Sequence, residues 1–382
     1  MAVTNRTHKH NRSIMKIGIP ASNRTVDVRI VDTTLRLSNG PLAHFMGPAI
    51  KGHDGLTAGA FAFLITHKDP DSGLERNVLF DLGPPKNWKT DLPEPFARLV
   101  SGWEDNGCII SIEKYVSEVL VENGVQLEDI ESLIWSHAHW DHTGRPSLFP
   151  PSVKLIVGPG ILEAFGPGYP ENQAAPFTSS ELAGRPVTEL SFAPSQITIG
   201  GLKAIDFFAD GSFYLLDAPG HAVGHINALA RTTSSPDTFI FLGADSYHLG
   251  AQLRPNEHTP LPDVIEIEGF SPCPCPGDLL TRIHPALPAG ENAARTTPFY
   301  SIPEKSVAVD SARAQDVVCK IQAFDADEDI LVLNAHEWNY YDVLELFPRR
   351  ANGWKEKGWK DRARWRFLRE LQGAVDLVRD EE

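Results

Sequence analysis

The stretch Ser136-His137-Ala138-His139-Trp140-Asp141-His142-Thr143-Gly144 places three imidazoles and one carboxylate within six positions, from 137 to 142. It directly follows an apolar run at residues 133–135, which is typical of a buried strand. At the end of an extended strand, His137 and His139 point to the same face, and a turn can bring Asp141 and His142 back beside them. This density of nitrogen and oxygen donors predicts a metal site, of which the segment supplies one half.

Three further candidate ligands stand downstream, each just past a short hydrophobic run of strand type. His221 follows the run at residues 213–216, Asp245 follows the run at 239–244, and His336 follows the run at 330–335. A scaffold strand can deliver a functional side chain to one rim of its sheet. We therefore expect these side chains to meet those of the first segment at one edge of the fold.

With these residues the chain resembles the metallo-β-lactamase superfamily of hydrolases, and most closely its branch of N-acyl homoserine lactone lactonases, over about residues 79 to 336. The resemblance implies an α+β fold, a four-layer αββα sandwich with metal ligands along one edge. It also implies that Asp81 supports the site and that His225 lies near it without binding metal. The metal ligands that it implies are His137, His139, Asp141, His142, His221, Asp245 and His336.

By the same resemblance, His137, His139 and His221 hold a first cation, while Asp141, His142 and His336 hold a second. Asp245 would bridge the two cations. Nitrogen and oxygen donors alone suit Zn²⁺ and also tolerate Mn²⁺, Fe²⁺ or Co²⁺, so two Zn²⁺ per chain are expected. Di-iron relatives that reduce oxygen or nitric oxide typically carry Glu at the place of His139, which disfavours redox chemistry, although a single-iron sulfur dioxygenase stays open as an alternative.

Two cations about 3.5 to 4 Å apart lower the pKa of a shared water enough to leave hydroxide at neutral pH, and this hydroxide can attack a carbonyl carbon. With the resemblance to the lactonase branch, the expected function is a dinuclear zinc-dependent hydrolase that opens a small cyclic ester, a lactone. Asp141 could pass on the proton as well as bind metal. The alternatives are a γ-lactam or cyclic carbamate hydrolase on the same site, then a glyoxalase II-like thioesterase, and last a non-catalytic metal-binding scaffold.

The residues after Asp245 leave the substrate contact open. The lactonase branch has Tyr three positions after its bridging Asp, whereas Asp245-Ser246-Tyr247-His248 has Tyr one position early and His248 in its place. Either side chain could donate a hydrogen bond to a developing oxyanion. Equally, Tyr247 could pack beneath the site and His248 could be a solvated loop residue. Asp141, Tyr247 and His248 are therefore the catalytic candidates.

Composition narrows the class of protein and of partner. The chain has 382 residues, 42% of them hydrophobic, and a formal net charge of −15, which disfavours a polyanionic partner such as nucleic acid. The four Cys are too few and scattered for a disulfide framework, and neither a signal peptide nor a membrane span is evident. We expect a cytoplasmic enzyme that acts on a small cyclic ester or amide, with a homodimer as one option for its assembly.

The chain divides by its patterning into a flexible lead-in at 1–26, a hydrolase domain at 27–345 and a basic, aromatic-rich helix at 346–382 packed on that domain. A Pro-rich insertion at about 251–300 would cover part of the substrate pocket. Helical spacing of apolar residues predicts helices at 109–123 and 307–324. Strands are predicted at 28–37, 58–66, 77–82, 154–157 and 330–333.

Overall fold

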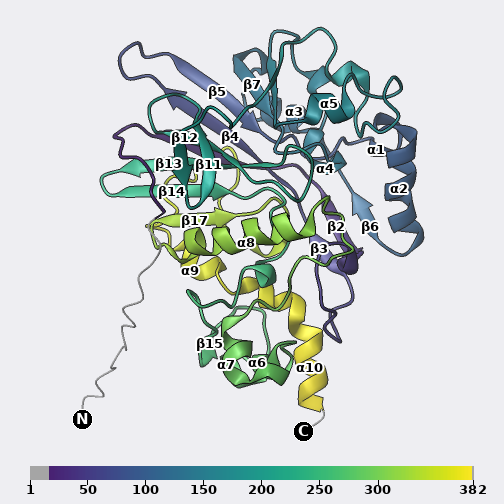
Figure 1. Cartoon of the computed structure of the whole chain (residues 1–382), viewed down its shortest axis with the longest axis vertical. Coiled ribbons are helices and arrows are strands. Elements are labelled where there is room, and N and C mark those ends of the chain that lie inside the picture. The colour runs from purple at the N-terminus through teal and green to yellow at the C-terminus, as the bar shows by residue number, and fades with distance from the viewer. Residues whose placement is uncertain (1–16, 381–382) are drawn as a thin grey trace.

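A computed structural model of the chain describes residues 17–380. Two six-stranded sheets form its centre (Figure 1). In spatial order, the strands of the first sheet are β1 (Val26–Asp32), β4 (Phe61–Lys68), β5 (Glu75–Phe80), β7 (Ile130–Ile134), β8 (Lys154–Val157) and β9 (Val187–Glu189). Those of the second sheet are β10 (Ile197–Ile199), β11 (Leu202–Asp206), β12 (Phe213–Asp217), β13 (Ile226–Ser234), β14 (Asp237–Leu242) and β17 (Ile330–Leu333).

The two sheets pack face to face over one apolar core. Val28 and Phe63 from the first sheet are buried in the same cluster as Leu215 and Ile240 from the second. Because successive side chains of a strand point to opposite faces, each sheet has a second apolar face to cover. Helices α3 (Val116–Glu122) and α5 (Ile161–Phe165) cover that face of the first sheet, and α8 (Ser311–Ala326) covers that of the second. The predicted four-layer αββα sandwich is confirmed.

Strand direction brings the site together at one edge. β5, β7, β8 and β9 run parallel to one another, and β17 runs parallel to β14 with Leu242 opposite Leu333. The carboxyl ends of parallel neighbours lie at the same edge of a sheet, which is where the predicted ligands follow β7, β14 and β17. The strand predicted at 330–333 matches β17 in both bounds.

Two secondary-structure predictions near the N-terminal half are wrong in part. The predicted helix at 109–123 begins as strand β6 (Ile109–Ser111), which pairs with β2 (Arg36–Gly40), and only then continues as α3. Pairing with β2 outweighs the helical spacing of the apolar residues. The predicted strand at 28–37 is divided between β1 and β2, because the chain turns at Thr34, whose φ is +66°.

The remaining elements surround the sandwich on the side of the site and below it. They are β3 (Leu56–Ala58), α1 (Trp88–Asp91), α2 (Glu94–Asp105), α4 (Trp140–Thr143), β15 (Val264–Ile265), β16 (Cys275–Pro276), α6 (Gly277–Arg282), α7 (Glu291–Thr296), α9 (Trp359–Ala363) and α10 (Gln372–Asp380). In Figure 1, β15, α6, α7 and α10 form a lobe beneath α8. Phe270, Leu279 and Leu280 of the Pro-rich insertion are buried there in the same core as Phe367 and Leu371 of the C-terminal segment.

The ends of the chain differ from a simple lead-in and a single helix. The C-terminal segment consists of α9, a 3₁₀ stretch at Arg366–Leu371 and α10. Residues 1–16 of the predicted lead-in lie outside the described residues, but Ile17 is buried and its carbonyl accepts a hydrogen bond from the N–H of Gly200. Among residues 17–380, no helix has both the length and the apolarity that a membrane span requires.

Candidate metal centre

The chain directly after β7 carries four of the seven predicted ligands. His137 and His139 lie in the extended segment behind Ile134, and Asp141 and His142 lie on the single turn of α4. His221 lies in the loop between β12 and β13, Asp245 follows β14 and His336 follows β17. The first sheet therefore contributes one half of the site and the second sheet the other half.

His137, His139, His221 and Asp245 form a first cluster, in which one ligand atom from each lies within 4.8 Å of the others. Nε2 of His221 lies 3.0 Å from Nδ1 of His139 and 3.4 Å from Oδ2 of Asp245. Nε2 of His137 lies 3.7 Å from the same oxygen. These atoms converge on one point, as the ligands of a single cation do.

Asp141, His142 and His336 form a second cluster by the same criterion. The other oxygen of Asp245, Oδ1, lies 3.0 Å from Nε2 of His142 and 3.0 Å from Nε2 of His336. Oδ2 of Asp141 lies 3.5 Å from Nε2 of His336. The carboxylate of Asp245 thus turns one oxygen to each cluster, and the structure brings all seven predicted ligand residues together.

The rings of His142 and His336 are oriented by hydrogen bonds on their far sides. Nδ1 of His142 lies 2.8 Å from Oδ2 of Asp81, and Nδ1 of His336 lies 2.8 Å from the carbonyl oxygen of Gly59. Since Nδ1 is the donor in both contacts, Nε2 is left to face the centre with its lone pair. Asp81, expected to support the site, occupies a supporting position in the structure.

The histidines of the two clusters differ in the direction of their pKa shifts. Burial, with the neighbouring His142 and His139, lowers the pKa of His137 well below its ordinary value. Burial also lowers the pKa of His221 in the same way. For Asp245, burial acts to raise the pKa, but the charges of His142 and His336 outweigh it and hold the pKa well below the ordinary value. Burial acts to lower the pKa of His142 and of His336, but the carboxylate of Asp245 outweighs it and raises both above the ordinary value. Neutral imidazoles and ionised carboxylates are the forms that ligate divalent cations, so His142 and His336 would each release a proton when a cation binds.

Buried atoms without partners show that these residues fit a metal. Nε2 of His137 and Nε2 of His248 are buried and make no hydrogen bond to any of the residues 17–380. Buried polar atoms are nearly always satisfied, so an unpaired nitrogen beside a cluster of donors fits a residue that binds a cation or a ligand. The donors are imidazoles and carboxylates, which suit Zn²⁺ and its neighbours among the divalent transition metals.

The structure separates the two candidates for substrate contact. Nε2 of His248 lies 3.3 Å from Oδ2 of Asp245, so this side chain faces the clusters. Tyr247 is buried in the core between the second sheet and α8. Its hydroxyl makes no hydrogen bond to any described residue, and its pKa is raised well above the ordinary value by burial, then by the nearby Tyr340. Tyr247 therefore lies behind the site, and His248 lies in it.

Two features of the site were missed in the sequence. Ser136, quoted there without a role, donates from Oγ to Oδ2 of Asp81 at 2.8 Å, and the same Oγ lies 3.0 Å from Nδ1 of His137. Its position directly before the first His was the signal that could have found it. The second feature is an aromatic wall, made of Phe45, Trp103 and Trp140.

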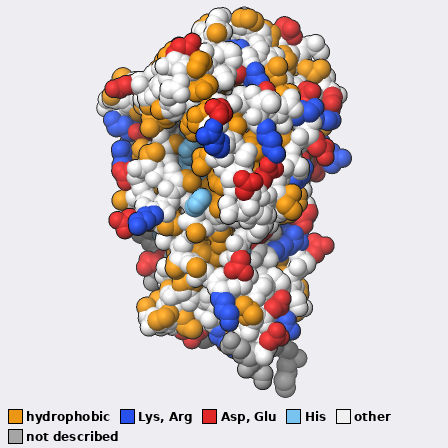
Figure 2. Space-filling model, turned by 90° about the vertical axis from the view of Figure 1, so that its right-hand side faces the viewer, with side chains coloured by type: hydrophobic (Ala, Val, Ile, Leu, Met, Phe, Trp, Pro, Cys, Tyr) orange, Lys and Arg blue, Asp and Glu red, His pale blue; other side chains and the backbone are white. Residues whose placement is uncertain are grey.

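The aromatic wall stands beside His248. The ring of Phe45 lies 4.6 Å from that of His248 and 6.1 Å from that of Trp103, which lies 6.4 Å from the ring of Trp140. Trp140 is the residue between His139 and Asp141, so the wall begins within the motif itself. On the face seen in Figure 2, histidine side chains reach the surface among hydrophobic ones. A substrate at the clusters would meet an apolar surface on this side.

The chain is similar to a known γ-lactamase and a known metallo-hydrolase along most of its sequence, although no family model matches it. Gamma-lactamase FDB1 of Fusarium pseudograminearum (strain CS3096) is 38% identical over 356 residues, which cover 91% of this chain and 83% of that protein. Metallo-hydrolase mfmC of Annulohypoxylon moriforme is 39% identical over 361 residues, which cover 94% of this chain and 91% of that protein.

Among solved structures, the chain is similar to an N-acyl homoserine lactone hydrolase with the product N-hexanoyl-L-homoserine bound at its catalytic metal center. The TM-score is 0.53 at 13% sequence identity, and the match covers 86% of this chain and 99% of that one. At this identity the similarity concerns the fold.

Proposed function

The chain belongs to the metallo-β-lactamase superfamily, in the group of this γ-lactamase and this metallo-hydrolase, and from that membership we propose that it is a dinuclear zinc hydrolase opening small cyclic esters. One observation carries the proposal. The carboxylate of Asp245, which belongs to the first cluster, turns Oδ2 to His221 of that cluster and Oδ1 to His142 of the second. A carboxylate in that position is what a bridged pair of cations requires.

The cations, when bound, would supply Lewis acidity toward a carbonyl oxygen and an activated water as nucleophile. His137, His139 and His221 would hold one, and Asp141, His142 and His336 the other, with Asp245 between them. Asp141 has a side chain 17% exposed, against 3% for Asp245. It is therefore the carboxylate that solvent and substrate can reach, and we assign it the transfer of the proton to the leaving group.

His248 is assigned to the substrate. Its Nε2 faces the clusters, 3.3 Å from Oδ2 of Asp245, and makes no hydrogen bond to any of the residues 17–380. It is therefore available to donate a hydrogen bond to the carbonyl oxygen as negative charge develops there. The aromatic wall would hold the apolar part of the substrate and exclude water from the same side. Tyr247 has no part in this assignment because its hydroxyl lies in the core.

A second candidate substrate class is the cyclic amide. It is favoured by the name of the relative from F. pseudograminearum, a γ-lactamase matched over 91% of this chain. An amide needs a proton on its leaving nitrogen, which Asp141 is placed to give. The two classes differ in the leaving atom and share the same residues, so both are tested on one protein.

The test is a substrate panel with purified, zinc-loaded protein. It contains γ-octalactone, 2-pyrrolidinone and an acyl-glutathione thioester. Acid released from the lactone and the thioester is followed by pH-stat, and the amino acid formed from the lactam, which is a zwitterion and releases no net proton at neutral pH, is measured by chromatography. We expect ring opening of the lactone, with the lactam as the second substrate. Turnover of the thioester alone would overturn both ring-opening proposals.

Loss of the bridge should remove metal and activity together. We predict that Asp245→Ala binds at least one equivalent less zinc than the unmodified protein and loses turnover, and that His139→Ala behaves alike. Zinc content is measured by mass spectrometry after dialysis, with Glu128→Ala, an exposed carboxylate, as the control. Two equivalents of zinc retained in Asp245→Ala would contradict the bridging role.

A further inference from the structure

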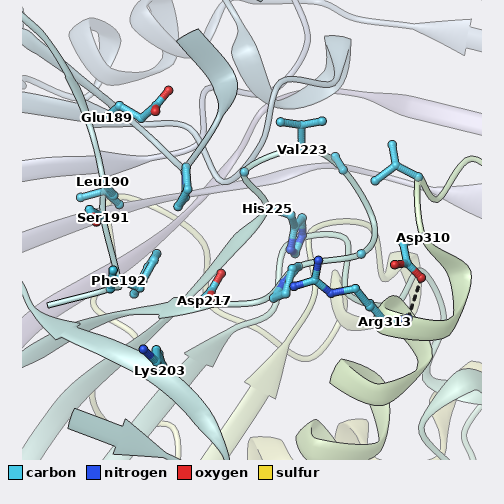
Figure 3. Close-up of a pocket in the computed structure, with 17 residues that line it drawn as sticks. Glu189, Leu190, Ser191, Phe192, Lys203, Asp217, Val223, His225, Asp310 and Arg313 are labelled. Carbon is cyan, nitrogen blue, oxygen red and sulfur yellow. Dashed lines mark hydrogen bonds between the residues drawn. The ribbon is translucent and has the colours of Figure 1, made fainter. Parts of the chain in front are cut away.

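A cavity of about 680 Å³ lies against the loop that carries His221, apart from the two clusters (Figure 3). Its walls come from the segment after β9, from β11, from the loop between β12 and β13 and from the start of α8. Residues on both sides of His221 line the cavity, but His221 itself does not, because its ring turns to the first cluster. The loop therefore separates the cavity from the candidate metal centre.

Two positively charged side chains line the cavity, and the carboxylate of Asp217 interacts with both electrostatically without forming an ion pair. Lys203 of β11 and Arg313 of α8 both line it, and neither forms an ion pair with any described residue. Two of the acidic residues in the lining are already engaged. Oε2 of Glu189 accepts from the N–H of Leu162 at 2.7 Å, and Oδ1 of Asp310 accepts from the N–H of Arg313 at 3.0 Å.

Asp217, at the end of β12, is the remaining acidic residue of the lining. Its carboxylate makes no hydrogen bond to any of the residues 17–380, and burial raises its pKa although Arg313 and Lys203 act against the shift. In Figure 3 the Arg313 side chain extends into the space between Asp217 and His225. Phe192 and Val223 add apolar surface to the same cavity. The lining thus combines two positively charged side chains that can bind an anion, a carboxylate that can accept a hydrogen bond, and an apolar surface.

We propose that this cavity is a second binding site, for the ring-opened acid that the proposed function would produce. The carboxylate of the acid would lie between Lys203 and Arg313, and its new hydroxyl or amino group would donate to Asp217. The hydrocarbon part would lie on Phe192 and Val223. A lactone or lactam before opening is neutral and lacks the anion, so the cavity selects product over substrate.

A ligand bound in the cavity would affect the metal centre through the loop that carries His221. The N–H of Val309 donates to the carbonyl oxygen of His221 at 3.1 Å, and that of Asp310 donates to Gly220 at 2.9 Å. A Cβ at Gly220, where φ is +129°, would lie 2.2 Å from the backbone nitrogen of Ala314. The loop therefore packs closely against the start of α8. Product bound between the loop and α8 would inhibit turnover without competing with substrate for the metal centre.

The test measures binding of 4-hydroxyoctanoate, the acid from γ-octalactone, to the full zinc-loaded chain by calorimetry. We expect binding at least tenfold weaker in a variant with Lys203→Met and Arg313→Met. Lys154→Met with Arg379→Met removes two exposed charges elsewhere and should leave the affinity unchanged. Equal affinity of the first variant and the unmodified protein, or no binding at all, would overturn the proposal.

Two further arms distinguish the cavity from the metal centre, and the product acid from simpler anions. Chelator-treated protein should retain the binding, since a carboxylate that binds only with metal present lies at the metal centre and would refute the cavity site. Octanoate lacks the hydroxyl, 4-hydroxyoctanamide lacks the charge, and inorganic phosphate offers charge alone. Each should bind more weakly than the hydroxy acid, and equal binding of phosphate or octanoate would refute the assignment to product.

The result is separable from that of the substrate panel. No turnover is needed for binding, so a negative result here counts against the cavity alone, and a failure to hydrolyse any ring counts against the proposed function alone. Lys203 and Arg313 are exposed, so the variants should fold, and Arg313→Lys provides a comparison that keeps the charge.

Discussion

Ser136 contacts a ligand of one cluster and the carboxylate that orients a ligand of the other. Its Oγ donates to Asp81, which also accepts from His142, and the same Oγ lies beside Nδ1 of His137. Groups that orient the ligands of a metal typically account for 10- to 100-fold in affinity or activity. A single hydroxyl therefore supports both halves of the candidate site.

We predict that Ser136→Ala lowers zinc affinity by about 10- to 100-fold while the protein stays folded. The reason is that His137 and Asp81 both lose the group that fixes their orientation. Zinc affinity is measured by competition with a chromophoric chelator, and Ser132→Ala, a buried serine of β7, is the matched control. Equal affinity in both variants would show that Ser136 does not orient the ligands.

Substitution of His248 should lower kcat far more than substitution of Tyr247. His248→Ala is expected to lower kcat on the order of 100-fold, as loss of one oxyanion donor does, with zinc content retained. Tyr247→Phe should leave kcat near that of the unmodified protein, because its hydroxyl is buried without a partner behind the site. The measurement is kcat on γ-octalactone for both variants. A large loss in Tyr247→Phe with little change in His248→Ala would mean that the assignment of His248 is wrong.

At this scale the sequence predicted which residues gather in the two clusters, because the motif is local and the three distal residues each follow a hydrophobic strand. Their role as metal ligands stays a prediction. The sequence left Tyr247 and His248 undecided, since their directions depend on the turn after β14. There Ala244 has φ +42° and the N–H of Ser246 donates to Gly243. A turn of that kind is set by its surroundings, which no residue spacing reports.

Among the elements, the start of the insertion, α8 and the C-terminal segment are joined at one buried ion pair. Nε of Arg254 donates to Oδ2 of Asp325 at 2.7 Å, and Arg254 also contacts the carbonyl oxygen of Arg364. Both side chains of the pair are less than 5% exposed. The pair thus connects three segments that are distant in sequence.

We predict that Asp325→Ala lowers the free energy of unfolding by about 3 to 5 kcal/mol, because it leaves a buried guanidinium uncompensated. The double variant Arg254→Met and Asp325→Leu should have a free energy of unfolding closer to that of the unmodified protein. Urea unfolding provides the measurement, with Asp316→Ala, from an exposed pair on the same helix, as the control. If the single and the double variant were equally destabilised, charge burial would not be the cause.

The elements that the sequence predicted best are those whose pattern is unambiguous. A run of four apolar residues predicted β17, and the helix expected at 307–324 is present as α8. The helix at 109–123 was misassigned in its first residues, since Ile109 and Ile112 fit a helical stripe while the partner that decides the matter, β2, lies about 70 residues earlier. Strand pairing between residues so far apart in sequence cannot be predicted from the spacing of neighbouring residues.

For the whole molecule, the site joins the two sheets. His137, His139 and His142 extend from the first sheet, and His221, Asp245 and His336 extend from the second. A cation held by both sheets binds only the folded chain, so it stabilises that chain by mass action, by about 2.7 kcal/mol at a free concentration 100 times its dissociation constant.

Removal of metal should therefore lower the thermal stability of the entire protein. We predict that chelator lowers Tm by several degrees and that added Zn²⁺ restores it. The measurement is thermal unfolding followed by circular dichroism, with Asp245→Ala expected to show little response to chelator. An unchanged Tm in the unmodified protein would mean that no metal links the sheets.

The order of the candidate ligands along the chain also determines how the site assembles during synthesis on the ribosome. Roughly 200 residues separate His137 from His336. At about 5 to 20 residues per second, synthesis of that stretch lasts on the order of 10 to 40 seconds. During that interval the three imidazoles and the carboxylate of the first half gain His221 and Asp245 with strands β10 to β14, and His336 follows only after β17. A cation that binds early would therefore be held by an incomplete set of ligands and would exchange until the last histidine is in place.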